Sequence, residues 1–415
     1  MGSVENGCVE QPLLKSKGLE EDIEEIRSCG QFMGLAVEEN KKLWCLAGPA
    51  IFTALAQYSL GALTQVFAGH LTTLELDAVS VENMVIAGLA YGIMAWGARW
   101  RPYAGKPSEL SSTACLGVTQ AIARLAGTFS LYMLPQLLAY ALNFPIQKFL
   151  QAQSKVMAMA WVSAFALVFH VFLSWLLIVR FGLGLVGAAV SLNVAWWVVV
   201  VGQFAYIAMG YCPGAWTGFS WAAFRDLGAF ARLSVASAIM MCLEFWYYML
   251  LVVLAGQLKN AQVAVAAISI CTNLNGWEIM VFFGFNAAIS VRISNELGAG
   301  RPRAAKLSIL VVVLSSALLG LFFLALVLAL RDVYGLPFTN SPEVARAVSR
   351  VAVIFSITLL LNSIQPVLTG VAVGAGWQWL VAYINVGCYY IVGLPLGFLL
   401  GSVFDLGVQV GKKLD

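Results

Sequence analysis

Long apolar segments recur along almost the whole chain, and they restrict its fold more than any other feature. Each is about 20 residues long, the length that an α-helix needs to cross the hydrocarbon core of a bilayer. Backbone polar groups inside lipid must be hydrogen-bonded within the segment, so these segments predict an all-α, polytopic membrane protein. They are Trp44–Ala68, Ala78–Trp96, Ala126–Phe144, Val156–Val179, Val186–Met209, Leu233–Leu254, Val263–Ile289, Leu307–Leu330, Val351–Val373 and Trp379–Leu400.

The composition agrees with this prediction and excludes other classes. Hydrophobic residues make up 60% of the chain and charged residues 11%, whereas soluble domains carry roughly 25% charged residues. The net charge of +3 is too small to indicate a nucleic-acid partner. The cysteines include no CxxC pair and the two histidines, His70 and His170, lie far apart, so we expect no metal site, no cofactor and no disulfide framework. Enzyme motifs such as HExxH and GxSxG are missing from the sequence.

The first forty residues differ from the rest because they are rich in glutamate. We predict that residues 1–40 form a disordered acidic tail in the cytoplasm. No apolar segment precedes Leu43, so we expect no cleavable signal peptide. The stretch from Glu10 to Leu14 is similar to an acidic dileucine sorting signal, one residue short of the usual spacing.

Basic residues indicate which ends of the helices face the cytoplasm, since cytoplasmic loops are enriched in Lys and Arg. The predicted cytoplasmic positions are Lys41, Lys42, Lys148, Lys155, Arg225, Arg232, Arg292, Arg301, Arg303 and Lys306. The first half of the chain conflicts with this scheme. Only the segment Ala126–Phe144 separates the basic loop 99–106 from Lys148, and one crossing cannot begin and end on the same side. A helix is therefore missing there.

An internal repeat identifies that helix, since transporters often contain weak sequence symmetry. Four short matches occur in the same order in both halves, at offsets of 187, 189, 195 and 223 residues. They are AGHL (68–71) with AGQL (255–258), AVSV (78–81) with AISI (267–270), AGKP (104–107) with AGRP (299–302), and FGLG (181–184) with FDLG (404–407). The jump in offset predicts two pseudo-repeated helical bundles with about ten of twelve helices.

The repeat also predicts the domain organisation. An amino-terminal lobe covers residues 41–210 and lacks its third helix near 99–125. A cytoplasmic linker follows at 211–232. A carboxyl-terminal lobe covers 233–415 and lacks its twelfth helix.

Several of these stretches resemble plant members of the MATE family, the multidrug and toxic compound extrusion transporters, in the branch that carries flavonoids and other secondary metabolites. The resemblance covers 41–98 and 126–409 and fails over 99–125. The stretches that carry it include QYSLGALTQVFAGH (57–70), CLEFWYYM (242–249), SVRISNELGAGRPRAAK (290–306) and VLTGVAVGAGWQ (367–378). It implies two six-helix lobes that face each other across a cleft, and antiport driven by an ion gradient, usually of protons in plants.

Glu244 is the strongest candidate for proton coupling, because a carboxylate in the middle of a membrane helix costs several kcal/mol unless it has a special role. Tyr247 and Tyr248 follow on the same helical face and could hydrogen-bond to it. The alternative is a neutral glutamate capped by a neighbouring helix. The resemblance matches Glu244 to a carboxylate of the family's seventh helix, a proposed proton site. Asn362 stands where the family often has Asp, and Thr64 where bacterial relatives have an acid.

Polar and aromatic residues inside the apolar segments are candidates for a cleft that holds a planar solute. Glu278 lies either in such a cavity or near the membrane interface, and Glu82 and Asn83 are interpreted as structural. Membrane bundles also use Asn and Gln to join helices, which is the alternative for each amide. The candidates are Gln57, Tyr58, Gln65, Asn193, Asn273, Asn275, Glu278, Asn286, Asn362, Gln365, Tyr383 and Tyr389.

The sequence therefore predicts a proton-coupled antiporter that moves flavonoid-like metabolites or xenobiotics out of the cytosol. The expected partners are the lipid bilayer, a small organic solute and protons, and we expect a monomer. The tonoplast is favoured over the plasma membrane. The alternative is a truncated or mis-spliced form that transports nothing.

Overall fold

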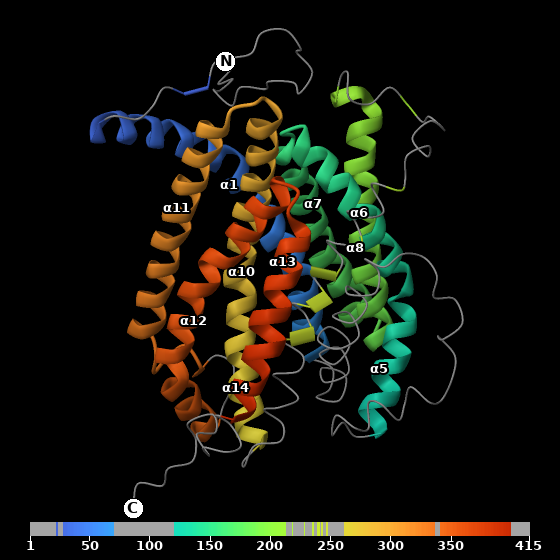
Figure 1. Ribbon diagram of the computed structural model, residues 1–415. Helices are drawn as coiled ribbons and strands as arrows, with labels where there is room; N and C mark the ends of the chain where they lie inside the picture. The colour runs from blue at the N-terminus through green and yellow to red at the C-terminus, as the bar shows by residue number, and fades with distance from the viewer. Residues whose placement is uncertain are drawn as a thin grey trace, which may run out of the picture.

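The computed structural model describes residues 22–23, 28–69, 120–212, 261–336 and 341–399, together with 218, 228, 235, 239–240, 242–243 and 246–247. Every element within these residues is helical, which confirms the predicted fold class. Seven of the helices are long and apolar enough to cross a membrane. Figure 1 shows them packed side by side as a bundle with their axes roughly parallel.

The helices of the first half begin with a long one, α1. The others are shorter, and two of them continue into π-helical segments. Their bounds are α1 Cys29–Gly69, α5 Gln120–Tyr132, α6 Leu134–Ala152, α7 Val156–Ser174 with η2 Trp175–Arg180, and α8 Gly184–Tyr206 with η3 Ile207–Tyr211.

The second half contains three long helices followed by one that is divided into three parts. Their bounds are α10 Ala261–Gly298, α11 Pro302–Ala329, α12 Pro342–Gly374, α13 Gln378–Asn385, η6 Val386–Gly393 and α14 Leu394–Phe398. Each long helix contains most of a predicted apolar segment, but α10 extends nine residues past the predicted end and α12 begins nine residues before the predicted start; α13, η6 and α14 together correspond to Trp379–Leu400.

Two differences from the prediction lie in the first half. Helix α1 begins at Cys29 rather than Trp44, so residues 29–40 of the predicted tail are helical. The predicted segment Ala126–Phe144 is divided between α5 and α6 at Met133, two residues before Pro135, whose missing N–H and ring disfavour a continuous helix. The predicted helix Ala78–Trp96 and most of Leu233–Leu254 lie outside the described residues.

Cys45 also differs from the prediction, because it is disulfide-bonded.

Two of the repeated motifs form the turns between helices. In the AGRP stretch, Gly300 has φ +73° and Pro302 begins α11. A left-handed residue after a helix favours glycine, and proline suits the first turn of the next helix. In the FGLG stretch, Gly182 and Gly184 have φ +66° and +52° between η2 and α8. In these two described copies, the repeated residues therefore form turns between helices.

The turn between α10 and α11 and the amino-terminal part of α1 lie at the upper end of the bundle in Figure 1. This end carries the basic residues around Arg301, so the positive-inside rule assigns it to the cytoplasm. Helix α1 ends and α5 begins in the lower part of the bundle. The residues between these two helices, where the missing helix is predicted, lie outside the described residues.

Helix α1 is the element that both halves of the bundle share. Its Leu60 belongs to a buried cluster with residues of α5, α6 and α8. Its Leu43 and Ala47 belong to another with residues of α10, α11 and α12. The two halves are therefore joined by burial of opposite stretches of one helix.

Small residues allow the helices of the second half to pack closely. A Cβ atom at Gly370 of α12 would lie 2.7 Å from the carbonyl oxygen of Asn286 in α10, and one at Gly374 would lie 2.6 Å from that of Ser290. Such close backbone approach is typical of helix pairs in membranes, where small residues replace the hydrophobic drive for association.

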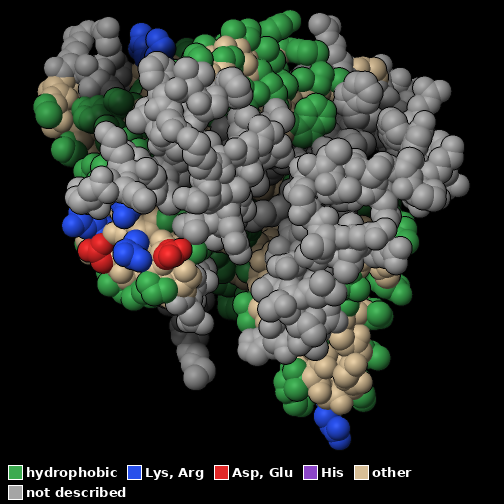
Figure 2. Space-filling view, turned by 90° about the horizontal axis from the view of Figure 1, so that it is seen from below, with side chains coloured by type: hydrophobic (Ala, Val, Ile, Leu, Met, Phe, Trp, Pro, Cys, Tyr) green, Lys and Arg blue, Asp and Glu red, His purple; other side chains and the backbone are tan. Residues whose placement is uncertain are grey.

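The lower end of the bundle, shown in Figure 2, has hydrophobic side chains over most of its described surface and charged ones of both signs at one edge. Exposed charged residues of the α11–α12 connection include Arg331 and Asp332, which form an ion pair of 3.5 Å. Exposed apolar side chains on the outer faces, such as Trp161 (72% exposed) and Leu318 (69%), suit contact with lipid tails.

We expect Gly370→Ala to destabilise the protein by about 1–3 kcal/mol, because the new methyl group must push α10 away from α12. The matched control is Gly61→Ala in α1, where a Cβ atom meets no other atom within 4 Å. Thermal unfolding in detergent should show a lower Tm for the first variant and an unchanged or higher Tm for the control. Equal Tm values would contradict the close α10–α12 contact.

Candidate functional site

Polar side chains join α1 to α7 along the first half of the bundle. The amide nitrogen of Gln57 donates to Oγ of Ser163 at 3.3 Å. Lower down, Oγ1 of Thr64 lies 3.1 Å from Nε2 of His170, and both residues are fully buried. These contacts assign Gln57 to the interface between helices, and they give His170 a structural partner in the first half.

A second group of predicted residues lies where α1, α10 and α12 meet. The ring of Tyr58 packs edge-on against Trp277, with 5.3 Å between ring centroids. Its hydroxyl lies over Gly276, where a side chain would clash with it. One residue earlier in α10, Oδ1 of Asn275 accepts a hydrogen bond of 2.9 Å from Asn362 of α12.

Glu278 lies near the middle of α10, one helical turn after Asn275, and is 4% exposed. Neither of its carboxylate oxygens has a hydrogen-bond partner in the structure as described. Its burial inside the bundle favours the cavity over the interfacial alternative, because an interfacial side chain would extend outward to the headgroups. A buried, unpaired carboxylate in this place is costly and so is a functional candidate by default.

The predicted proton-coupling group lies only partly within the described residues. Glu244 and Tyr248 are outside them. Tyr247 is described, and its ring stacks on that of Tyr389 in η6, with centroids 4.7 Å apart. The hydroxyl of Tyr390 also donates to the carbonyl oxygen of Leu243 at 2.8 Å. The described part of this segment therefore packs against η6.

The structure does not bring the remaining candidates together into one group. The amide of Asn286 donates to the carbonyl oxygen of Pro366 at 2.6 Å, and that of Asn193 donates to the carbonyl oxygen of Tyr132 at 2.9 Å. Both therefore join neighbouring helices. Gln365 contacts Thr369 of its own helix at 3.4 Å. Tyr383 is 73% exposed on α13; Gln65 and Asn273 are half-buried.

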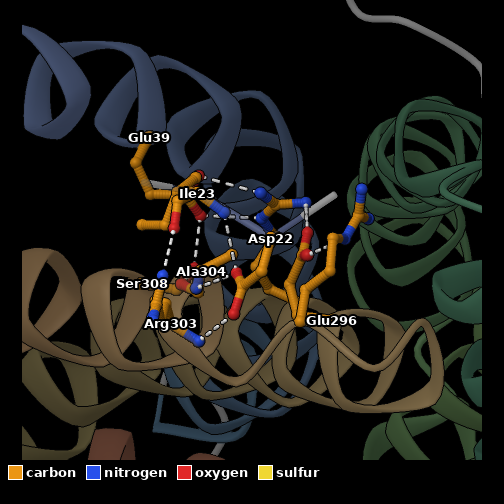
Figure 3. Close-up of polar contacts among 9 residues, drawn as sticks. Asp22, Ile23, Glu39, Glu296, Arg303, Ala304 and Ser308 are labelled. Carbon is orange, nitrogen blue, oxygen red and sulfur yellow. Dashed lines mark hydrogen bonds and ion pairs between the residues drawn. The ribbon is translucent and has the colours of Figure 1, made fainter. Parts of the chain in front are cut away.

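An ion-pair network at the cytoplasmic end was not predicted from the sequence. Arg292 of α10 bonds to Glu39 of α1 at 2.7 Å and to Glu296 of its own helix at 2.6 Å. Glu296 also bonds to Arg301 at 2.7 Å. Figure 3 shows this network together with Ser308 of α11, whose hydroxyl donates to Glu39 at 2.5 Å. The i,i+4 spacing of Arg292 and Glu296 indicates the local pair, whereas Glu39 has no such pattern.

Asp22 adds a contact at the start of α11, also visible in Figure 3. Its carboxylate accepts hydrogen bonds from the backbone N–H groups of Arg303 (2.8 Å) and Ala304 (3.1 Å). Desolvation raises the pKa of Asp22, but these backbone N–H groups lower it by more, so its pKa lies below the ordinary value. An anionic side chain is favoured here because the first N–H groups of a helix lack partners.

Apolar helices joined by buried polar contacts, with charged residues at the ends of the bundle, define a polytopic helical membrane protein. Comparison with known proteins identifies its family. The family model described as MatE matches residues 113–176 and 236–399. This match includes 113–125, which our resemblance excluded.

Relatives and solved structures agree with the family match. Protein DETOXIFICATION 33 of Arabidopsis thaliana is 53% identical over 90% of this chain and 84% of its own length, and DETOXIFICATION 31 of the same plant is 48% identical over 94% and 81%. The crystal structure of the eukaryotic MATE transporter AtDTX14 superimposes with a TM-score of 0.80 at 28% identity, covering 91% of this chain and 92% of that one. The chain belongs to the MATE family, whose members are transporters rather than enzymes.

We expect Thr64→Val to destabilise the protein by about 1 kcal/mol, since it leaves a buried nitrogen of His170 without its partner. The control is Thr53→Val in the same helix, because Oγ1 of Thr53 bonds only the carbonyl oxygen of Pro49 in its own helix. Thermal unfolding of both variants in one detergent provides the comparison. A larger loss for Thr53→Val would contradict a role for Thr64 in joining α1 to α7.

Proposed function

We propose that this chain is a proton-driven antiporter that moves organic solutes out of the cytosol. The observation that carries the proposal is the unpaired carboxyl group of Glu278, buried near the middle of a membrane helix. Family membership supports transport, and the names of the relatives indicate detoxification.

A proton explains how Glu278 can exist at this depth. An ionised carboxylate without a partner would cost several kcal/mol there, whereas the protonated group is neutral. An antiporter needs such a group, which binds a proton on one side of the membrane and releases it when water or solute reaches the site. Glu244 is proposed as a second carboxyl group of this kind, as the resemblance implies, and helical spacing places Tyr247 and Tyr248 on its face of the helix. Asn362 cannot titrate and would hold Asn275 in place.

Two aromatic pairs, one between α1 and α10 and one that involves η6, support a planar organic solute such as a flavonoid. The rings of Tyr58 and Trp277, and those of Tyr247 and Tyr389, already pack against each other. Opening either pair would present flat apolar surfaces with a phenolic hydroxyl, which suits aromatic solutes with polar edges. We further propose a monomer in the tonoplast, with the plasma membrane as the alternative.

A non-transporting form of a MATE protein is the second candidate, because the sequence predicts that a helix is missing near residues 99–125. Helix α1 ends and α5 begins at the same end of the bundle (Figure 1). The alignment with DETOXIFICATION 33 is 408 positions long but includes only 90% of the 415 residues of this chain. Some of the aligned positions in the relative therefore have no counterpart in this chain. Sequencing the transcript across codons 95–125 would show whether the coding region is short there.

We expect Glu278→Gln to lower proton-driven uptake at least tenfold, since glutamine cannot bind and release a proton. The assay is uptake of a flavonoid glycoside into vesicles with an acidic lumen, which should also collapse when nigericin dissipates the pH gradient. Glu244→Gln should have the same effect. The matched control is Glu343→Gln, an exposed glutamate at the start of α12.

Two outcomes would separate the alternatives. Unchanged uptake by Glu278→Gln, in a chain that otherwise transports, would remove Glu278 from proton coupling. No uptake by the unaltered chain, with correct insertion into the vesicle membrane, would favour the non-transporting form.

A further inference from the structure

We propose that Glu39 and Arg292 form a latch that closes the cytoplasmic end of the protein, and that this latch must break before the protein opens to the cytosol. The purpose of the latch rests on the proposed function, but its existence is tested without transport. It joins α1, the first helix of the chain, to α10 and α11 of the second half.

The contact is specific in its geometry. Nε and one terminal nitrogen of Arg292 donate to the two carboxylate oxygens of Glu39 at 2.7 and 2.8 Å. Such a two-point contact between a guanidinium and a carboxylate fixes the orientation of both groups as well as their distance. Next to it, Oγ of Ser315 in α11 contacts Oδ1 of Asn40 at 3.1 Å. Two consecutive residues of α1 are therefore held by the second half.

Burial makes this latch behave as a unit. The side chains of Glu39 and Glu296 are 7% and 3% exposed, and those of Arg292 and Arg301 are 19% and 21% exposed. Two acids and two arginines alternate, so the network is neutral as a whole. Separating Glu39 from Arg292 leaves a poorly hydrated charge on each side, which is strongly unfavourable unless water enters. The ion pair is therefore expected to be either fully formed or fully separated with water around both charges, rather than partly separated.

Helix α1 contains a position at which its amino-terminal part can move. Pro49 lies between the latch and the contacts of Gln57 and Thr64 with α7. Proline removes one hydrogen bond from the helix and permits a bend there. The part of α1 before Pro49 can thus leave α10 and α11 while the part after it stays on α7.

The latch also explains a motif that proton coupling leaves unexplained. The stretch SVRISNELGAGRPRAAK supplies Arg292, Glu296 and Arg301. After α10 ends at Gly298, the left-handed Gly300 turns the chain. The N–H of Arg301 then donates to the carbonyl oxygen of Glu296 at 2.8 Å. This turn returns the guanidinium of Arg301 to Glu296, so that Glu296 pairs with both Arg301 and Arg292.

The test measures exposure of Leu43, which is 1% exposed and packs with Ile293 in the same cluster, one turn after Glu39. Leu43→Cys is placed in the full chain with the native cysteines replaced, and a membrane-impermeant maleimide is applied to the cytoplasmic side. We expect slow labelling in this background and at least tenfold faster labelling when Glu39→Gln is added. The matched control is Glu38→Gln, because Glu38 is the exposed neighbour of Glu39 and should leave the rate unchanged.

Arg292→Lys keeps the charge but cannot make the two-point contact, so it should give an intermediate rate. Equal rates for Glu39→Gln and Glu38→Gln would overturn the latch, as would labelling from the opposite side of the membrane only. The result holds whether or not the chain transports, so a failure of the proposed antiport remains distinguishable.

A second measurement guards against misfolding of the Glu39→Gln variant. Asn40→Cys and Ser315→Cys should form a disulfide under mild oxidation when the latch is closed, and at least fivefold more slowly when Glu39→Gln is added. Addition of Glu38→Gln should not slow it. Fast cross-linking in the Glu39→Gln variant would overturn the proposal, since α1 would then remain on α11 without the ion pair. Each variant is first required to run as a single peak in size-exclusion chromatography.

Discussion

The cost of a polar or charged group inside lipid is the constraint on which the rest of this structure depends. Helices satisfy the backbone, and contacts such as Thr64 with His170 and Asn275 with Asn362 satisfy side chains. The ion pairs of Glu39, Arg292 and Glu296 lie at the end of the bundle that carries the basic loop residues. Among the described acidic side chains, Glu278 stands out because both of its carboxylate oxygens are buried without a partner, and departures of this kind are expected where a protein works.

Helix α1 contacts both regions to which the proposals above give a role. It contacts α10 through Glu39 near its beginning and through Tyr58 further on, and it contacts α7 through Thr64. Glu278 lies in α10 next to the turn that Tyr58 contacts. Glu278 and the Glu39–Arg292 contact therefore belong to the same pair of helices, α1 and α10, although they are far apart along α10.

Much of the architecture was predictable because apolar length is a local property of the sequence. Seven predicted membrane segments correspond to membrane-length helices, and the AGRP and FGLG repeats mark turns with left-handed glycines. The prediction was less accurate where two local preferences compete. Residues 29–43 are too polar for a membrane segment yet continue α1, and the apolar segment 126–144 contains Pro135, which divides it.

The sequence by itself determined the fold class, the family and the residues at which an acid is unexpected, because each depends on residue type and spacing along one chain. Only the tertiary structure decided which of these polar residues have partners. It paired Asn275 with Asn362, left Glu278 unpaired, and placed Glu39 against Arg292 at a separation of 253 residues. Such pairings depend on how helices pack against each other, and no pattern within a single helix specifies them.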